Sequence, residues 1–367
     1  MITVRQDRPA RWRVSLATVA IALAGVLFAQ PAALSAAAQP AALPAAAAIT
    51  AHTKNFQGIN WADPRDNFAD DAVVPTGLST SDSYATTYAK ATSILRSFRK
   101  NTGANTVRLP INPYSVGNAW WDSYTGAIDA ASALGFKVIL SYWEGTGSYK
   151  DGKIDNLDSF WHMWTTVTTK YASNGKVYFD PMNEPHGYSL TEWSDLAAKW
   201  LSTYPSVRRD RIFVAGSGYD DDVKGVCADS RLDGTYLALH DYAFWGTKTY
   251  AGWVDDIKGR IGTCAGRTVL QEFGVPMTTA LNYNGSSTEG STSANNYVAF
   301  LQAMTDTLRS LKMGSVYWPG LRKDDSYSLT QLQGSGTNLS LYVNNESGLD
   351  RLIWGWGKGK PSLPSQR

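Results

Sequence analysis

The chain has 367 residues, a length that suits one large domain or two ordinary ones. Lys and Arg number 34 against 32 Asp and Glu, so the net charge is only +2, and no basic patch indicates a nucleic-acid partner. Aromatic residues are frequent, with 14 Trp and 19 Tyr, and such rings suit both a packed core and a protein that stacks on flat ligands.

The N-terminus has the pattern of a secretory signal peptide over residues 1–38. Four arginines precede an apolar stretch, Val14–Phe28, which is short for a membrane span, and the small residues Ala33–Ala38 follow it. The alternative is an N-terminal membrane anchor. Residues 39–54 are Ala/Pro-rich and predict a flexible leader. We therefore expect an extracellular protein, monomeric and not stably associated with membranes after cleavage.

Only two cysteines occur, Cys227 and Cys264. In an exported protein one disulfide is the expectation, and two buried free thiols are the alternative. No C-x-x-C spacing is present and the four histidines are scattered, so the sequence predicts neither a metal site nor a cofactor.

From residue 55 onward, short apolar stretches alternate with longer amphipathic ones. The amphipathic stretches have helical spacing and predict helices at Tyr84–Lys100, Ala119–Leu134, Leu157–Tyr171, Leu190–Tyr204, Trp253–Ile261 and Ala294–Leu311. The apolar stretches predict eight strands, in chain order Phe56–Trp61, Thr106–Pro110, Lys137–Tyr142, Val177–Met182, Arg211–Ala215, Thr235–His240, Thr268–Phe273 and Gly314–Trp318.

This alternation predicts an α/β fold, a (β/α)8 TIM barrel spanning residues 55–357 as a single domain. A doubly wound open sheet is the alternative, but it usually has a Gly-rich turn after its first strand, and NWADPRDN (60–67) has none. We expect residues 334–357 to form a hairpin that closes the barrel, and residues 358–367 to be disordered. Cys227 and Cys264 each precede one of two neighbouring strands, so they can meet at the bottom of the barrel.

Polar or aromatic residues stand where each strand stops. In such barrels the chemistry lies at the carboxyl ends of the strands. These ends carry Asn60, Trp61, Arg108, Tyr142, Trp143, Glu144, Asn183, Glu184, His240, Asp241, Tyr242, Glu272 and Trp318.

Two of these residues, Glu184 and Glu272, end strands that lie roughly across the barrel from each other. A pair of carboxyl groups that flanks a glycosidic bond is what sugar hydrolysis requires, since one donates a proton and the other attacks or activates water. Either glutamate alone is as easily a salt-bridged residue of the barrel mouth. The pair, with Arg108, His240 and Tyr242 aimed the same way, favours catalysis.

Several strings of this chain resemble glycoside hydrolase family 5, a family of retaining (β/α)8 glycosidases. The resemblance extends from Asn55 to Trp318 and rests on GINW (58–61), VRLP (107–110), NEPHG (183–187), His240 with Tyr242, QEFG (271–274) and Trp318.

The resemblance implies that Glu184 is the acid/base and Glu272 the nucleophile. It further implies supporting roles: Arg108 and Tyr242 keep Glu272 ionised, Asn183 binds the sugar 2-OH, His240 helps set the protonation of Glu184, and Trp318 forms the floor under the sugar. Charge pairing with Arg108 is expected to lower the pKa of Glu272, and the resulting negative charge to raise that of Glu184.

One departure concerns the third strand, where family members commonly have a histidine and this chain has Ser141, Tyr142, Trp143 and Glu144. The identity of the sugar therefore stays open, and Glu144 either binds substrate or braces a loop. We expect His186 to brace a loop. Candidate sugar contacts are Trp61, Trp120, Trp121, Trp143 and Trp245, whereas we expect Trp161, Trp164 and Trp200 in the core. Five loop charges are expected to be solvated, with a place on the rim of the cleft as the alternative: Asp63, Asp66, Lys323, Asp324 and Asp325.

The sequence thus predicts a secreted retaining β-glycosidase that acts on a polysaccharide or oligosaccharide. Cellulose-like β-1,4-glucan is the first choice, and mannan, β-galactan or exo-action on short β-glycosides are the rivals. A carbohydrate-binding barrel without catalysis is the alternative of another class, although both glutamates are present. An unrelated barrel enzyme would need a strand-borne lysine or a metal cluster.

Overall fold

The computed structural model describes residues 53–144, 150–286 and 293–359. The signal peptide predicted for residues 1–38, nearly all of the leader and most of the C-terminal tail lie outside these ranges. Within the described ranges, no helix combines the length and the apolar character that crossing a membrane requires.

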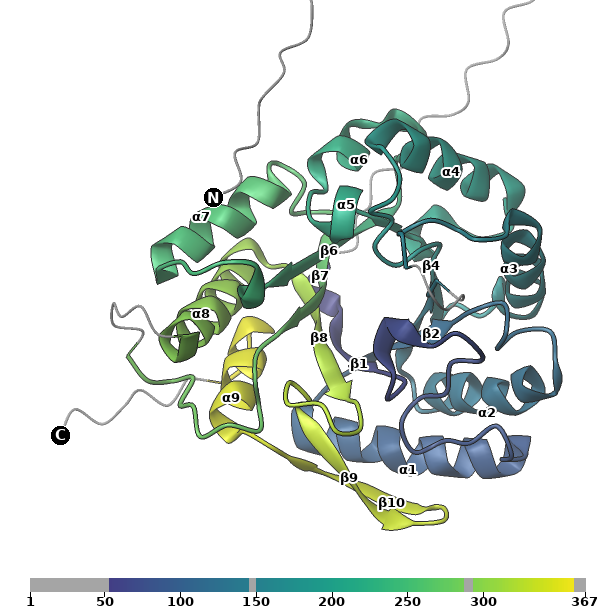
Figure 1. Cartoon of the computed structure of the whole chain (residues 1–367), viewed down its shortest axis with the longest axis horizontal. Helices are drawn as coiled ribbons and strands as arrows, with labels where there is room; N and C mark the ends of the chain where they lie inside the picture. The colour runs from purple at the N-terminus through teal and green to yellow at the C-terminus, as the bar shows by residue number, and fades with distance from the viewer. Residues whose placement is uncertain (1–52, 145–149, 287–292, 360–367) are drawn as a thin grey trace, which may run out of the picture. The chain divides into compact units, whose positions relative to one another are not determined.

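Eight parallel strands form the centre of the molecule, and helices surround them (Figure 1). The strands neighbour one another in the order β4-β3-β2-β1-β8-β7-β6-β5, and a parallel bridge between Phe179 and Ile212 joins the two ends into a barrel. The (β/α)8 prediction is confirmed. The strands are β1 Gln57–Trp61, β2 Thr106–Ile111, β3 Lys137–Tyr142, β4 Val177–Asp180, β5 Phe213–Ala215, β6 Tyr236–Tyr242, β7 Thr268–Gly274 and β8 Gly314–Leu321.

Five of the longer helices begin at a side chain that caps their free backbone N–H groups. The Ser83 hydroxyl accepts from Thr86 N, and Ser189 forms a reciprocal capping box with Glu192. The segment after β5, too short for a secure prediction, folds as two short helices, α5 and α6. The helices around the barrel are α1 Tyr84–Thr102, α2 Ala119–Ala133, α3 Leu157–Tyr171, α4 Leu190–Thr203, α5 Ser217–Asp220, α6 Lys224–Ala228, α7 Tyr250–Ile261 and α8 Ser293–Leu311.

The C-terminal segment differs from its prediction. A hairpin of β9 (Thr330–Ser335) and β10 (Asn338–Val343) is present, but helix α9 (Glu346–Gly355) follows it where the hairpin was expected to continue. The Asn345 side chain caps this helix by accepting from Gly348 N. Its buried positions, which include Leu349 and Leu352, have helical spacing, and this periodicity prevails over the polar/apolar alternation read from the sequence.

Alternation along each strand separates the barrel interior from the layer under the helices. On β4, Tyr178 packs in an aromatic cluster with Phe56, Phe213 and Tyr236, while Val177 and Phe179 belong to the larger core outside the barrel. Since side chains alternate with period two, the inward face that carries Tyr178 carries Asp180 two residues later. The barrel interior therefore changes from an aromatic layer to a polar layer towards the carboxyl ends of the strands.

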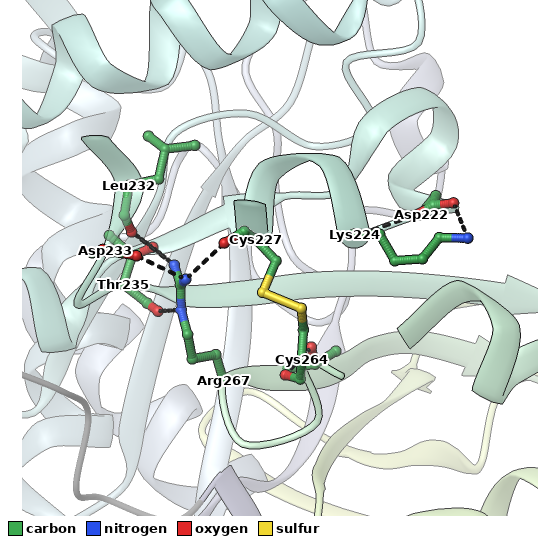
Figure 2. Close-up of a disulfide and its surroundings, with 9 residues drawn as sticks. Asp222, Lys224, Cys227, Leu232, Asp233, Thr235, Cys264 and Arg267 are labelled. Carbon is green, nitrogen blue, oxygen red and sulfur yellow. Dashed lines mark hydrogen bonds and ion pairs between the residues drawn. A yellow bond between two sulfur atoms is a disulfide. The ribbon is translucent and has the colours of Figure 1, made fainter. Parts of the chain in front are cut away.

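A disulfide joins Cys227 of α6 to Cys264, which lies between α7 and β7, as predicted (Figure 2). Arg267 lies beside it and donates to the carbonyls of Leu232 and Thr235, at 2.7 and 2.9 Å. Thr235 immediately precedes β6 and Arg267 immediately precedes β7, so the disulfide is at the amino ends of these strands, opposite the mouth.

Candidate active site

Arg108 is the centre of the polar layer inside the barrel. It points inward from β2 and is buried. Its guanidinium donates to Asp180 Oδ2 at 3.0 Å, to Ser141 Oγ at 2.9 Å and to Asn60 Oδ1 at 3.2 Å. Since these partners come from β4, β3 and β1, the cation is held rigidly by three neighbouring strands.

The remaining Arg108 contacts reach the mouth of the barrel. One N–H donates to Glu272 Oε1, and another donates to Asn183 Oδ1 at 2.7 Å. Because the Asn183 oxygen accepts from Arg108, its NH2 group is left to face the cleft that Asn183 lines. The same cation thus orients the amide and neutralises the carboxylate.

Glu272 reaches the site because β7 contains an extra residue. Leu239 of β6 pairs with Leu270, but the next residue, His240, pairs with Glu272, so Gln271 is a bulge in the β7 strand. Strict alternation from the inward-facing Val269 would place Glu272 towards the helices, and the bulge turns it inward. There the Tyr242 hydroxyl donates to Glu272 Oε2 at 2.9 Å.

Glu184 follows β4 in a left-handed backbone conformation, with φ at 49°. Such a conformation is uncommon outside glycine and is concentrated at functional sites. Its side chain is 21% exposed, and its Oε1 lies 3.0 Å from His240 Nδ1. The carboxyl group is therefore open to the cleft on one side and held by the imidazole on the other.

The two glutamates face each other at short range. A carboxylate oxygen of Glu184, one of Glu272 and a ring nitrogen of His240 all lie within 4.8 Å of one another. Retaining glycosidases have carboxyl groups roughly 5 Å apart, whereas inverting enzymes need about 6.5–9.5 Å to admit a water. The arrangement fits the shorter class.

The environments of the two carboxyl groups differ in charge. Burial raises the pKa of Glu184 to about 7, and the positive charge of Arg108 only partly opposes this. Burial also raises the pKa of Glu272, so the predicted net lowering is wrong, although Arg108 acts downward as expected. Only Glu272 has a guanidinium and a tyrosine hydroxyl that donate directly to it, and these contacts favour its ionised form.

These residues line a cleft of about 450 Å³. Trp318 and Trp143, with ring centroids 5.5 Å apart, form an aromatic surface within it, as predicted. Large apolar rings are exposed along the rim, with Phe68 71% and Trp245 69% exposed. Exposed rings that surround polar groups are typical of a binding cleft, because isolated proteins otherwise cover such surface.

Three of the tryptophans considered as sugar contacts lie elsewhere. Trp61 is buried because it alternates with the inward-facing Asn60, and its indole N–H donates to Thr76 O at 2.8 Å. Trp120 and Trp121 are buried on α2, in the core outside the barrel. Their predictions as platforms are wrong, whereas Trp143 and Trp245 line the cleft. Trp164 and Trp200 are in the core as expected, and Trp161 packs against it.

Glu144 braces a loop. Its two carboxylate oxygens accept from Asp151 N at 3.0 Å and Gly152 N at 3.1 Å, and burial raises its pKa to about 7. It is buried and does not line the cleft. His186 Nδ1 donates to the Glu184 carbonyl oxygen, 3.0 Å away, and the ring stacks on Tyr219 at the rim of the cleft.

The charges expected to be solvated divide into two groups. Lys323 and Asp324 are exposed, but Asp63 is buried and accepts from Val74 N and the Arg65 side chain. Asp66 and Asp325 line the cleft, where Arg322 joins them at 2.9 and 2.8 Å. Solvation was the wrong prediction for these three aspartates, because each meets a cation or a backbone donor: Asp63 and Asp325 within their own loops, and Asp66 across to Arg322.

Glu184, His240 and Glu272 also offer three ligand atoms close enough for a metal ion. However, Arg108 already presents its positive charge to Glu272, so a cation would bind against electrostatic repulsion. The donor set fits a pair of carboxyl groups in acid–base chemistry better than a metal centre.

Two buried carboxyl groups of the site escaped the sequence analysis. Asp180 ends β4, and an aspartate in the apolar string VYFD was a signal for it. Asp220, whose Oδ2 lies 3.2 Å from His240 Nε2, is one of three successive aspartates, and nothing in the sequence distinguishes it from Asp221 and Asp222.

Comparison with known proteins agrees with the family resemblance of the sequence. A family model described as Cellulase (glycosyl hydrolase family 5) matches residues 67–320. The catalytic domain of the major endoglucanase from Xanthomonas campestris pv. campestris is 17% identical, with a TM-score of 0.57 over 84% of this chain and 95% of that one. An endocellulase from Pyrococcus horikoshii is 16% identical, with a TM-score of 0.57 over 83% of this chain and 93% of that one. At these identities the structures show a shared fold.

Proposed function

Because this chain belongs to glycosyl hydrolase family 5, the cellulase family, we propose that it hydrolyses a β-1,4-linked glucan with retention of configuration at the anomeric carbon. The observation that carries the proposal is the pair of carboxyl groups, Glu184 and Glu272, with oxygens within 4.8 Å and unlike surroundings.

In the first step, Glu184 gives its proton to the glycosidic oxygen. Glu272 attacks the anomeric carbon, the bond from this carbon to the leaving oxygen breaks, and a glycosyl ester of Glu272 forms. In the second step Glu184 takes a proton from water, whose oxygen attacks the same carbon and releases Glu272. Two inversions in succession return the original configuration.

The environment of Glu184 supports both of its roles. Before the reaction, burial favours the protonated form of Glu184. The negative charge of Glu272, whose carboxylate lies nearby, acts in the same direction. Ester formation removes the negative charge of Glu272, and the pKa of Glu184 then falls, because a like charge nearby has been lost. The acid of the first step therefore becomes the base of the second without movement of the chain.

The polymer is oriented by the positions of these groups. The sugar attacked by Glu272 lies over Trp318, within reach of the Asn183 amide, which would donate to a ring hydroxyl. The leaving sugars lie on the Glu184 side of the cleft. There, Tyr219 and Trp245 form an aromatic wall with ring centroids 6.1 Å apart, suited to the flat faces of β-linked sugars.

The choice of glucan is supported by the descriptions of the similar structures as endoglucanase and endocellulase. Mannan, β-galactan and short β-glycosides attacked from one end are the rivals, because the third strand ends in Ser141, Tyr142, Trp143 and Glu144 without the histidine that family members commonly have there. A binding barrel without catalysis is disfavoured, since both glutamates and the groups that position them are present.

We also propose that the enzyme is exported and acts as a monomer outside the cell. The proposal rests on the arginines before residue 14, the apolar stretch Val14–Phe28 and the small residues that follow.

A panel of β-glucans, mannans, galactans and aryl glycosides tests the proposed function, with product size and anomeric configuration followed by proton NMR. We expect β-1,4-glucan to be cleaved fastest, with the β-anomer appearing first and equilibrating later. Initial release of the α-anomer would contradict the retaining mechanism, and preference for another polymer would replace the substrate while leaving the mechanism intact.

A further inference from the structure

Asp220 is a buried carboxyl group with no cation of its own. It is fully buried, whereas Tyr219 before it is exposed and the two aspartates after it are partly exposed. Neither of its oxygens makes a hydrogen bond with conventional geometry among the described residues, and the same is true of His240 Nε2. The two unsatisfied groups face each other, with Oδ2 and Nε2 3.2 Å apart.

The backbone is shaped to aim this side chain inward. Gly218 has φ at 70°, and Asp220 itself has φ at 56°, in the left-handed region that residues with a side chain seldom adopt. Bonds from Ser217 N to Asp222 O and from Asp221 N to Ser217 O hold the turn closed. The turn therefore holds one of three successive aspartates against the imidazole in an uncommon backbone conformation.

His240 connects this carboxyl group to the proposed acid/base. Its Nδ1 lies 3.0 Å from Glu184 Oε1 while its Nε2 faces Asp220, so the ring stands between two carboxyl groups. The ring is buried, and burial lowers its pKa to about 4, so it is neutral and carries one proton. A neutral imidazole donates a hydrogen bond from one nitrogen and accepts one at the other. It can therefore bond to both carboxyl groups only if one of them is protonated and the other is ionised.

We propose that Asp220 is a positioning residue for the acid/base: by accepting the His240 Nε2–H, it fixes the tautomer whose Nδ1 lone pair accepts the proton of Glu184. The inference rests on the proposed function. Glu184, His240 and Asp220 then share two protons, with the negative charge on Asp220. When Glu184 passes its proton to the leaving oxygen it becomes negative, while Glu272 loses its own charge in the ester, so the summed charge of Glu184, His240, Asp220 and Glu272 does not change.

Charged residues on the neighbouring strands β2, β4 and β7, and in the turn at Asp221, also act on Glu184, His240 and Asp220. Burial is the largest influence on Asp220 and raises its pKa well above the usual range; Asp180 of β4, Glu184 and Glu272 of β7 act in the same direction, and Arg108 of β2 opposes them. The proposed negative charge on Asp220 therefore depends on Arg108 and on the Nε2–H that the carboxylate accepts. Asp221 acts on both Glu184 and His240 from the cleft side. Replacement of Asp220 by asparagine removes one negative charge near Glu184 and leaves these others in place.

The dependence of kcat/KM on the leaving group distinguishes a positioning role of Asp220 from a merely structural one. We compare Asp220→Asn with Asp222→Asn, which makes the same change two residues away, on two glycosides with one glycone. For the substrate whose leaving group must be protonated, Asp220→Asn should lower the midpoint of the alkaline limb of kcat/KM by about one pH unit, a tenfold loss at high pH. A 2,4-dinitrophenyl leaving group needs no proton, so its kcat/KM should change little.

An unchanged midpoint, or an equal loss on both substrates, overturns the inference. Hydrolysis by the unchanged enzyme with retention shows separately that the proposed function stands. A second test does not require the turn to tolerate Asp220→Asn: in 15N NMR of the unchanged enzyme at pH 6, His240 should carry its proton on Nε2. Assignment uses His240→Asn, and a proton on Nδ1 at this pH contradicts the proposal.

Discussion

Glu184 occupies an unfavourable position for a carboxylate. Its backbone has φ at 49°, and burial raises its pKa from 4.5 to about 7. A shift of this size corresponds to at most about 3 kcal/mol of preference for the neutral form. The same feature that makes the group an acid near neutral pH therefore destabilises the folded chain when the group is ionised.

The pH dependence follows with a definite sign. Because the folded pKa is above the unfolded one, the contribution of Glu184 to folding falls as pH rises from about 4.5 to about 7, and the loss is complete above that. Glu184→Gln should therefore raise the melting temperature more at pH 8 than at pH 5, when each is compared with the unchanged enzyme. Equal differences at the two pH values, measured by calorimetry, would show that the carboxyl group is not buried as described.

The catalytic activity should also change over the pH range in which Glu184 titrates. The first step needs protonated Glu184, so kcat/KM should fall tenfold per pH unit above about pH 7 for poor leaving groups.

At the scale of elements, the sequence predicted the strands and the residues at their ends, because period-two alternation and apolar runs determine both. It could not predict the bulge at Gln271, since an inserted residue is visible only as a shift in pairing between β6 and β7. It also missed the turn that buries Asp220, and it assigned Trp61 to the cleft because proximity to a strand end does not say which face the side chain takes.

The β6–α7 loop should contribute binding but no chemistry. Trp245 is 69% exposed at the rim, where its ring lies beside those of Tyr219 and Phe244. Trp245→Ala should raise KM for the polysaccharide about tenfold, the effect of losing about 1.4 kcal/mol of stacking, with kcat on a short aryl glycoside unchanged. Tyr342→Ala, at an exposed position of β10, is the matched control. Loss of kcat on the aryl glycoside would instead place Trp245 in the catalytic step.

At the scale of the whole molecule, the covalent cross-link and the catalytic groups lie at opposite ends of the barrel. The disulfide spans 37 residues at the amino ends of β6 and β7, and the cleft is at the carboxyl ends. The double variant Cys227→Ala with Cys264→Ala should lose about 2–4 kcal/mol of unfolding free energy, because the unfolded chain is no longer constrained. Its kcat at 25 °C should be unchanged, and a lower kcat in the folded variant would show that the two ends are coupled.

The barrel architecture was predictable as a whole because eight apolar strands alternating with amphipathic helices have few alternative arrangements. The C-terminal helix was not, since Trp354 and Trp356 read as strand residues until the Asn345 cap and the contact of Trp354 with Asp306 of α8 are known.

The central claim is that Glu272 forms a bond to the sugar while Glu184 does not. A 2-deoxy-2-fluoro glycosyl fluoride of the preferred sugar tests it, because the fluorine slows hydrolysis of the ester and lets it accumulate. Peptide mass spectrometry should find one sugar on Glu272, with labelling absent in Glu272→Gln and normal in the surface control Asp255→Asn. A label on Glu184, or any label retained by Glu272→Gln, would contradict the account.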